Sequence, residues 1–322
     1  MMKPPQFSPS PSPSPSPANT AIPDVAVTVT AIEGNRQWLD GGSMFGNVPR
    51  PVWEKWVKPD ATGRIELACR AMLVRISGES GDKLILCEAG IGAFFDPSMA
   101  DRYGVREKDH RLVANLAAIG ITPDDIDFVI LSHLHFDHAG GILPTFAEIQ
   151  SGNKDLLFRN AKYVTGMRGF QRAMQPHARD RASFIPGMTD KLKASGRLIL
   201  VDGETHPDVM PDVCSFRFSD GHTPGQMHTV IKGENAKMVF AGDLVPGRAW
   251  VHVPVSMGYD RFPELVIDEK EALYALAVPE HWWVFYTHDA SCAASQVESI
   301  TEGKRDKIRP CHEQASLLSF RL

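Results

Sequence analysis

The stretch from Asp127 to Gly141 constrains the fold of this chain more than any other part of it. It reads D-F-V-I-L-S-H-L-H-F-D-H-A-G-G. The apolar run at 128–131 is typical of a buried strand, and four metal-capable side chains follow it within six residues. The two glycines at the end allow the backbone to turn tightly. The sequence therefore predicts a sheet that delivers a cluster of polar side chains to a strand end.

The spacing of these side chains indicates how they would share metal ions. Residues two apart in an extended segment point the same way, so His133 and His135 can reach one ion together. Asp137 and His138 follow the strand end, where the backbone turns, and are expected to face a second ion. Imidazole and carboxylate ligands suit zinc, and also manganese, iron or cobalt. A histidine-rich surface loop is the alternative, which the neighbouring buried strand disfavours.

This pattern resembles the H-x-H-x-D-H signature of the metallo-β-lactamase superfamily. Three downstream segments resemble the later elements of that family: G-H-T-P-G at 221–225, F-A-G-D at 240–243 and F-Y-T-H-D at 285–289. The resemblance covers about residue 25 to 295. It implies an α/β fold, an αββα sandwich of two packed sheets with helices outside, in a single domain. Hydrophobic periodicity alone supports only the α/β class.

The resemblance also implies two divalent metal ions, with zinc as the expected metal. The implied ligands are His133, His135 and His222 for the first ion, Asp137, His138 and His288 for the second, and Asp243 as the bridge between them. Three ligands and a bridge leave an open position on each ion, which is typical of a catalytic site. A hydroxide shared by the ions would attack the substrate, and Asp137 would also pass a proton to the leaving group.

Glu88 occupies a position where the family commonly has aspartate, and it is expected to orient the metal-binding loop. The segment D-G-G-S-M-F-G at 40–46, taken with M-G-Y-D at 257–260, resembles the branch of N-acyl-homoserine lactonases. Known lactonases place a tyrosine three residues after the bridging aspartate, where this chain has Pro246. Tyr259 is therefore the candidate catalytic residue that would assist the carbonyl. The candidates for holding an acyl chain are Phe45, Trp53 and Met257.

Two alternatives to a lactonase stay open. One is another hydrolase of the same fold, which would cleave an ester, a phosphotriester or a thioester. The other is a mononuclear iron oxygenase of the persulfide type, which shares most of these motifs. The number of bound ions separates the classes, since the hydrolase needs two ions and the oxygenase a single iron.

Composition limits the partners of this 322-residue chain. Its net charge of −5 disfavours a nucleic-acid or membrane-surface partner, and no apolar run is long enough to cross a bilayer. A small-molecule substrate is the expected partner. The five cysteines are scattered without C-x-x-C pairs, which indicates free thiols and a reduced, cytoplasmic location.

Three divisions of the chain are expected. Residues 1–22 are rich in serine and proline and are predicted to be disordered, residues 23–297 form the hydrolase domain, and residues 298–322 form a polar C-terminal tail. Residues 166–195 are expected to be a helical surface insertion, with a lid or a homodimer contact as the alternative.

An ordered loop is expected at 39–46. The principal expected strands are 25–32, 65–76, 83–87, 128–131, 161–165, 198–202, 214–218, 228–232, 238–241 and 282–286, and the expected helices include 109–119, 141–150 and 268–277.

Overall fold

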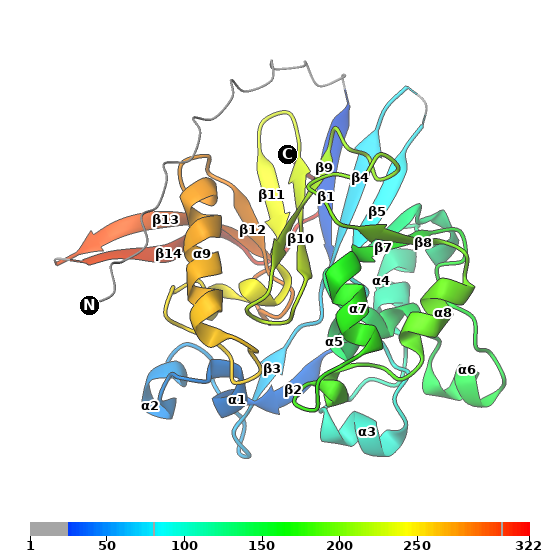
Figure 1. The fold of residues 1–322 in the computed structure, drawn as a ribbon, viewed down its shortest axis with the longest axis horizontal. Helices are drawn as coiled ribbons and strands as arrows, with labels where there is room; N and C mark the ends of the chain where they lie inside the picture. The colour runs from blue at the N-terminus through cyan, green and yellow to red at the C-terminus, as the bar shows by residue number, and fades with distance from the viewer. Residues whose placement is uncertain (1–24, 80, 304) are drawn as a thin grey trace, which may run out of the picture.

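The computed structural model describes residues 25–79, 81–303 and 305–322. The serine- and proline-rich segment predicted at residues 1–22 lies outside the described residues. Two β-sheets pack face to face, and helices cover their outer faces (Figure 1). This arrangement confirms the predicted αββα sandwich of the α/β class.

The first sheet has seven strands in the spatial order β15-β1-β4-β5-β6-β7-β8. Their bounds are β1 (Ala26–Ile32), β4 (Ala71–Ser77), β5 (Lys83–Cys87), β6 (Phe128–Leu131), β7 (Lys162–Gly166), β8 (Leu198–Val201) and β15 (Phe320–Arg321). The neighbours from β5 to β8 are parallel. Their carboxyl ends therefore lie along one edge of the sheet, where ligand sites of α/β proteins collect.

The second sheet has six strands in the order β14-β13-β12-β11-β10-β9. Their bounds are β9 (Cys214–Ser219), β10 (Gln226–Lys232), β11 (Lys237–Phe240), β12 (Trp283–Phe285), β13 (Ala294–Glu302) and β14 (Arg305–Gln314). β11 and β12 are parallel. The chain leaves both of these strands at the same edge, shortly before Asp243 and His288.

Apolar side chains from both sheets fill the space between them. Val29 and Ile85 of the first sheet belong to one core with Phe216, Phe240 and Phe285 of the second, each at most 1% exposed. Burying a side chain of this size contributes about 1.5–3 kcal/mol relative to leaving it in water. The two sheets therefore form a firm support for the loops at their edge.

The helices cover the outer faces of the sheets and the rim around the loops (Figure 1). Their bounds are α1 (Gly41–Phe45), α2 (Arg50–Trp53), α3 (Pro97–Arg102), α4 (Arg111–Ala118), α5 (Phe136–Ala139), α6 (Phe146–Gln150), α7 (Met167–Met174), α8 (Met188–Ala194) and α9 (Pro263–Ala277). Leu112 and Leu116 of α4 pack on the first sheet, and Leu273 and Tyr274 of α9 pack on the second. Among the described residues, no helix combines the length and the apolar character that crossing a membrane requires.

The strand predicted at 65–76 is two strands, β3 (Arg64–Leu67) and β4. Between them the N–H groups of Ala68 and Arg70 donate to the carbonyls of His288 and Thr287, at 3.3 and 3.0 Å. β3 pairs instead with β2 (Gln37–Asp40) in a small separate sheet. The loop predicted at 39–46 likewise contains the end of β2 and helix α1. The Asp40 carboxylate begins that helix by accepting from the Ser43 N–H at 2.7 Å.

The helix predicted at 141–150 is shorter, because it comprises only α6 after a 3-10 turn at Gly140–Ile142. Leu143 precedes Pro144 and is extended, with φ −95° and ψ 151°, as the residue before a proline prefers. The boundary predicted at residue 298 falls inside β13, and residues 298–322 are not a separate tail. They complete the β13–β14 hairpin and add β15 beside β1.

Candidate metal centre

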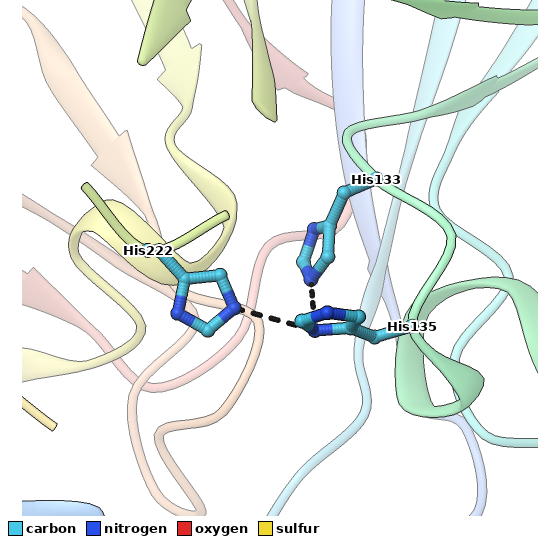
Figure 2. A group of neighbouring side chains, drawn as sticks. All are labelled: His133, His135 and His222. Atoms are coloured by element: carbon cyan, nitrogen blue, oxygen red, sulfur yellow. Dashed lines mark hydrogen bonds between the residues drawn. The ribbon is translucent and has the colours of Figure 1, made fainter. Parts of the chain in front are cut away.

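Three buried histidines converge at the edge of the two sheets. His133 and His135 follow β6, and His222 lies in the loop between β9 and β10 (Figure 2). The Nδ1 atom of His135 lies 3.0 Å from Nε2 of His133 and 3.3 Å from Nε2 of His222. The three side chains come from both sheets, so the sandwich itself brings their nitrogens together.

Asp243 lies between this group and a second pair of histidines. Its Oδ2 atom is 3.2 Å from Nε2 of His222. Its Oδ1 atom is 3.3 Å from Nε2 of His138 and 3.2 Å from Nε2 of His288. One oxygen of this carboxylate therefore faces the first group of histidines and the other oxygen faces the second.

Asp137 completes the second group. Its carboxylate oxygens lie 3.8 Å from Nε2 of His138 and 3.5 Å from Nε2 of His288. The Nε2 amide of Gln37, a fully buried residue of β2, donates to Oδ2 of Asp137 at 2.7 Å. Gln37 was not predicted from the sequence, because nothing in its local pattern points to a contact 100 residues away.

The structure thus brings all seven predicted ligands into one cluster. Three sets have ligand atoms within 4.8 Å of one another: His133, His135 and His222; His133, His138 and Asp243; and Asp137, His138 and His288. The first and third sets coincide with the predicted division between two ions. The second set overlaps both, as expected when two binding positions are adjacent.

Several buried polar atoms of the cluster have no hydrogen-bond partner. They include Nε2 of His135, both ring nitrogens of His138 and Oδ1 of Asp243. The last three lie 3.2–3.3 Å from oppositely charged neighbours without forming a well-aligned hydrogen bond. Orphaned polar atoms are rare inside folded proteins because burying one without a partner is costly. Imidazole nitrogens and carboxylate oxygens are the donors that zinc and related divalent ions bind. The residues present therefore fit a pair of divalent cations.

The candidate histidine ligands differ in the direction in which their surroundings shift the pKa. Burial, reinforced by the neighbouring imidazoles, lowers the pKa of His133 and His135 well below the ordinary value. Burial also opposes charge on His138 and His288. Asp243, together with Asp137 and Glu88 around His138 and with Cys69 beside His288, outweighs burial and raises the pKa of both histidines well above the ordinary value. Burial alone would raise the pKa of Asp243, yet His138 and His288 hold it well below its usual range. Asp243 is therefore ionised at the centre of the cluster.

Glu88 supports the cluster from behind, in the role predicted for it. It is fully buried, and its Oε1 atom accepts from the Ser132 N–H at 2.6 Å. Its Oε2 atom lies 3.2 Å from Nδ1 of His138. Its backbone has a φ of 69°, which is unusual for a residue other than glycine. The longer glutamate therefore both fixes the loop and orients one candidate ligand.

Two further contacts orient histidines on the opposite side. Nδ1 of His222 lies 2.9 Å from Oδ1 of Asp260, whose Oδ2 accepts from the Met257 N–H at 2.6 Å. Nδ1 of His288 lies 2.7 Å from the carbonyl oxygen of Ala68. Such outer contacts fix the ring that faces an ion. Sequence analysis placed Asp260 in the 257–260 motif but did not predict its bond to His222.

A cavity of about 370 Å³ opens onto the cluster. It borders five of the seven candidate ligands: His135, Asp137, His222, Asp243 and His288. A larger cavity of about 700 Å³ lies beside residues 56–58 and β14 but touches only His288 among the candidate ligands. We therefore take the smaller cavity as the substrate pocket, and its size suits a small molecule. Its wall comprises Leu39, Met44, Tyr103, Phe136, Arg179, Asp180, Ala182, Ser183, Met257, Gly258 and Tyr259.

The wall differs from the prediction in two respects. Met257 lines the pocket, but Phe45 and Trp53 do not, because Phe45 stacks between Trp53 and Trp250 in a separate core, with ring centroids 5.4 and 4.6 Å apart. Arg179, Asp180, Ala182 and Ser183 of the insertion line the pocket, so this segment is more than a surface insertion.

Tyr259, the predicted catalytic residue, stands at the mouth of the pocket and is 44% exposed. Burial of the rest of its side chain raises the pKa of Tyr259 above the ordinary value. Its hydroxyl therefore keeps its proton at neutral pH and can donate a hydrogen bond into the pocket.

This chain is similar in sequence to known metal-dependent proteins. The family model described as the metallo-beta-lactamase superfamily matches residues 64–288. An N-acyl homoserine lactonase of Bacillus thuringiensis is 25% identical over 185 residues, which are 56% of this chain and 63% of that protein. The match therefore spans less than two thirds of the relative's length.

Solved structures with a similar fold cover nearly the whole chain. A protein of Staphylococcus aureus described as a probable metal-dependent hydrolase is 26% identical, with a TM-score of 0.76 over 93% of this chain and 98% of its own. AidC, described as a dizinc quorum-quenching lactonase, is 18% identical, with a TM-score of 0.66 over 91% of this chain and 96% of its own. At that identity the second likeness shows the fold alone.

Proposed function

The chain belongs to the metallo-β-lactamase superfamily, and from this we propose that it is a metal-dependent hydrolase that opens the ring of N-acyl-homoserine lactones. The proposal includes two divalent ions, with zinc as the first choice. Their proposed ligands are the seven clustered side chains described above. The name of the curated Bacillus relative and the description of the Staphylococcus protein support the reaction class.

One observation carries the proposal more than any other. Asp243 is only 6% exposed and sets one carboxylate oxygen toward His222 and the other toward His138 and His288. A carboxylate placed in this way can serve two ions at once, because each of its oxygens faces a different group of histidines. This geometry favours the hydrolase over the mononuclear iron oxygenase.

Two bound divalent ions would polarise the substrate carbonyl and supply a nucleophile at neutral pH. The other parts of the reaction fall to side chains. Asp137 borders the pocket and is held by Gln37, so we propose that it carries a proton to the leaving ring oxygen. Tyr259 keeps its proton and lies across the same pocket, so we propose that its hydroxyl donates to the carbonyl oxygen.

The pocket wall supports a substrate with an apolar tail. Leu39, Met44, Phe136 and Met257 line it next to the candidate ligands. We propose that these side chains, rather than Phe45 and Trp53, contact the acyl chain. We also propose a small-molecule substrate as the partner of this site, and a cytoplasmic location for the protein, in keeping with its five free cysteines.

The test is proton release in weakly buffered solution by zinc-loaded protein with N-acyl-homoserine lactones of several acyl lengths. A phosphotriester and a simple aryl ester are assayed in parallel. We expect one proton per lactone opened, and a His135→Ala variant without turnover. Cleavage of the phosphotriester or the ester, with every lactone left intact, would replace the lactonase proposal with the alternative hydrolase.

A further inference from the structure

Arg179 carries a positive charge into the wall of the substrate pocket. It lies in the insertion between α7 and α8 and is the one lysine or arginine among the described residues that line this pocket. Its Nη2 atom donates to the carbonyl oxygen of Gly258 at 2.9 Å. A guanidinium group has five N–H donors, so the contact with Gly258 leaves further donors for a ligand.

The neighbouring side chains do not neutralise this charge. Asp180 would be the nearest acidic partner in the sequence, but Arg172 binds its Oδ2 atom at 2.5 and 3.0 Å. Arg261 approaches the same oxygen at 3.8 Å. Asp180 is buried by these contacts, and within the described part of the chain no carboxylate forms an ion pair with Arg179.

Further contacts place the insertion beside the metal centre. Arg261 donates its backbone N–H to the carbonyl oxygen of His222 at 3.1 Å. Further along the insertion, Phe184 forms a backbone bridge with His135. The insertion is therefore attached to both sides of the cluster, and the backbone that carries Arg179 is anchored beside the candidate ligands.

We propose that Arg179 determines specificity by binding a hydrogen-bond acceptor that lies outside the scissile ring. This inference rests on the proposed lactonase function and names the part of the substrate that the wall recognises, the amide carbonyl of the N-acyl group. A charged donor binds a carbonyl more strongly than a neutral one, and Leu39, Met44 and Met257 beside it offer only apolar contact. The site therefore prefers acylamino lactones to plain alkyl lactones of equal length.

Arg179 also links the insertion to the 257–260 loop, so a purely structural role must be separated from recognition. The two roles differ in one measurable respect. Loss of a link between loops impairs every substrate alike, whereas loss of recognition impairs only substrates that carry the acceptor. A pair of matched substrates therefore distinguishes them.

The experiment compares Arg179→Met and Arg179→Lys with the wild-type zinc-loaded enzyme. The substrates are an N-acyl-homoserine lactone and a γ-alkyl lactone of similar length without the amide. The control is Arg159→Met, which removes an exposed arginine paired with Asp124 away from the pocket. We expect Arg179→Met to lower kcat/KM for the amide substrate about tenfold, through KM, and to change the plain lactone less than about twofold. Arg179→Lys should fall between.

Equal losses for both lactones in Arg179→Met would overturn the inference and leave the lactonase proposal standing. Wild-type protein that opens neither lactone would overturn the lactonase proposal, and the inference with it. Binding of the ring-opened N-acyl-homoserine, measured by calorimetry, gives a readout besides turnover. We expect Arg179→Met to weaken this binding about tenfold, and unchanged binding would also contradict a recognition role.

Discussion

The floor and the wall of the substrate pocket are built in different ways. The floor is the cluster of seven candidate ligands, six of them at most 7% exposed, at the ends of strands in two packed sheets. The wall comes mostly from β2, α1, the insertion and the 257–260 loop. Met44 and Met257 pack in a small separate core, and the hydrogen bond from Arg179 to Gly258 joins the insertion to the 257–260 loop. This contrast indicates that the floor fixes the chemistry and the wall selects the substrate.

Asp243→Ala should have the largest effect, because this carboxylate faces both groups of histidines in the floor. We expect loss of more than half of the bound metal and a fall in kcat/KM of more than about a hundredfold. This exceeds the usual effect of removing a residue that contacts only a metal ligand and not the ion. Metal analysis and lactone turnover measure the two effects. Asp124→Ala, an exposed aspartate on the first sheet's side, is the control and should retain both. Full metal content in Asp243→Ala would show that this carboxylate does not bridge two ions.

His228 is expected to make the stability of the sheet beneath the floor depend on pH. This buried residue of β10 has Nδ1 2.9 Å from the Ala241 carbonyl oxygen and Nε2 2.8 Å from Oγ of Ser219. Burial lowers the pKa of His228 to about 4. Between that value and about 6.5 the unfolded chain binds more protons than the folded one, so stability rises with pH in this window.

The wild-type protein should therefore lose about 3 kcal/mol of unfolding free energy through His228 as the pH falls from 6.5 to 4. His228→Gln keeps a donor and an acceptor but does not titrate, so its loss over this range should be smaller by that amount. Denaturant unfolding at several pH values measures the difference. Parallel stability curves for the two proteins would show that His228 does not titrate in this way.

Asp260 connects the floor to the wall, because it contacts both His222 and the Met257 N–H. In Asp260→Asn either the His222 ring nitrogen or the Met257 N–H meets an NH₂ group instead of an oxygen, and the negative charge is lost. We expect metal affinity to fall about 10- to 100-fold, as measured by competition with a chelator. Asp268→Asn, on the exposed surface of α9, is the matched control. Unchanged affinity with only a lower melting temperature would limit Asp260 to a structural role.

Tyr259→Phe should have the smallest effect, because it removes one hydroxyl from the wall and keeps the ring. We expect kcat for the lactone to fall about tenfold or less if the hydroxyl donates to the carbonyl, the range of one hydrogen bond. Tyr103 lines the same pocket, so Tyr103→Phe is the control. An equal loss in both variants would show that neither hydroxyl has a specific role in the reaction.

Sequence analysis was more successful for the floor than for the wall, for a physical reason. His133, His135, Asp137 and His138 lie within six residues, so their local pattern predicts one cluster. The resemblance of the segments 221–225, 240–243 and 285–289 to family motifs adds the three later ligands. Gln37 reaches the candidate ligand Asp137 and Arg179 reaches the pocket wall through contacts of 100 and 79 residues in sequence separation. No local pattern encodes such contacts, because packing of the whole fold creates them.

The errors in secondary structure have similar causes. The strand predicted at 65–76 is interrupted where Ala68 and Arg70 bond to the 287–288 segment instead of a neighbouring strand. The β13–β14 hairpin was missed because its exposed face is polar, and polar alternation beyond residue 298 has no apolar run to signal a strand. In both cases the pairing with segments far away in the sequence decides where the strands lie, and the local sequence does not specify that pairing.

The most direct test of the central claim is the number of metal ions per chain. Purified protein loaded with zinc and freed of excess metal is measured by elemental analysis, alongside His222→Ala and His288→Ala, which each remove a ligand from one group. We predict about two ions per chain in the wild type and about one in each variant. A single ion per chain in the wild type, retained in His288→Ala, would contradict the two-ion site, and a single iron in the protein before zinc loading would favour an iron oxygenase.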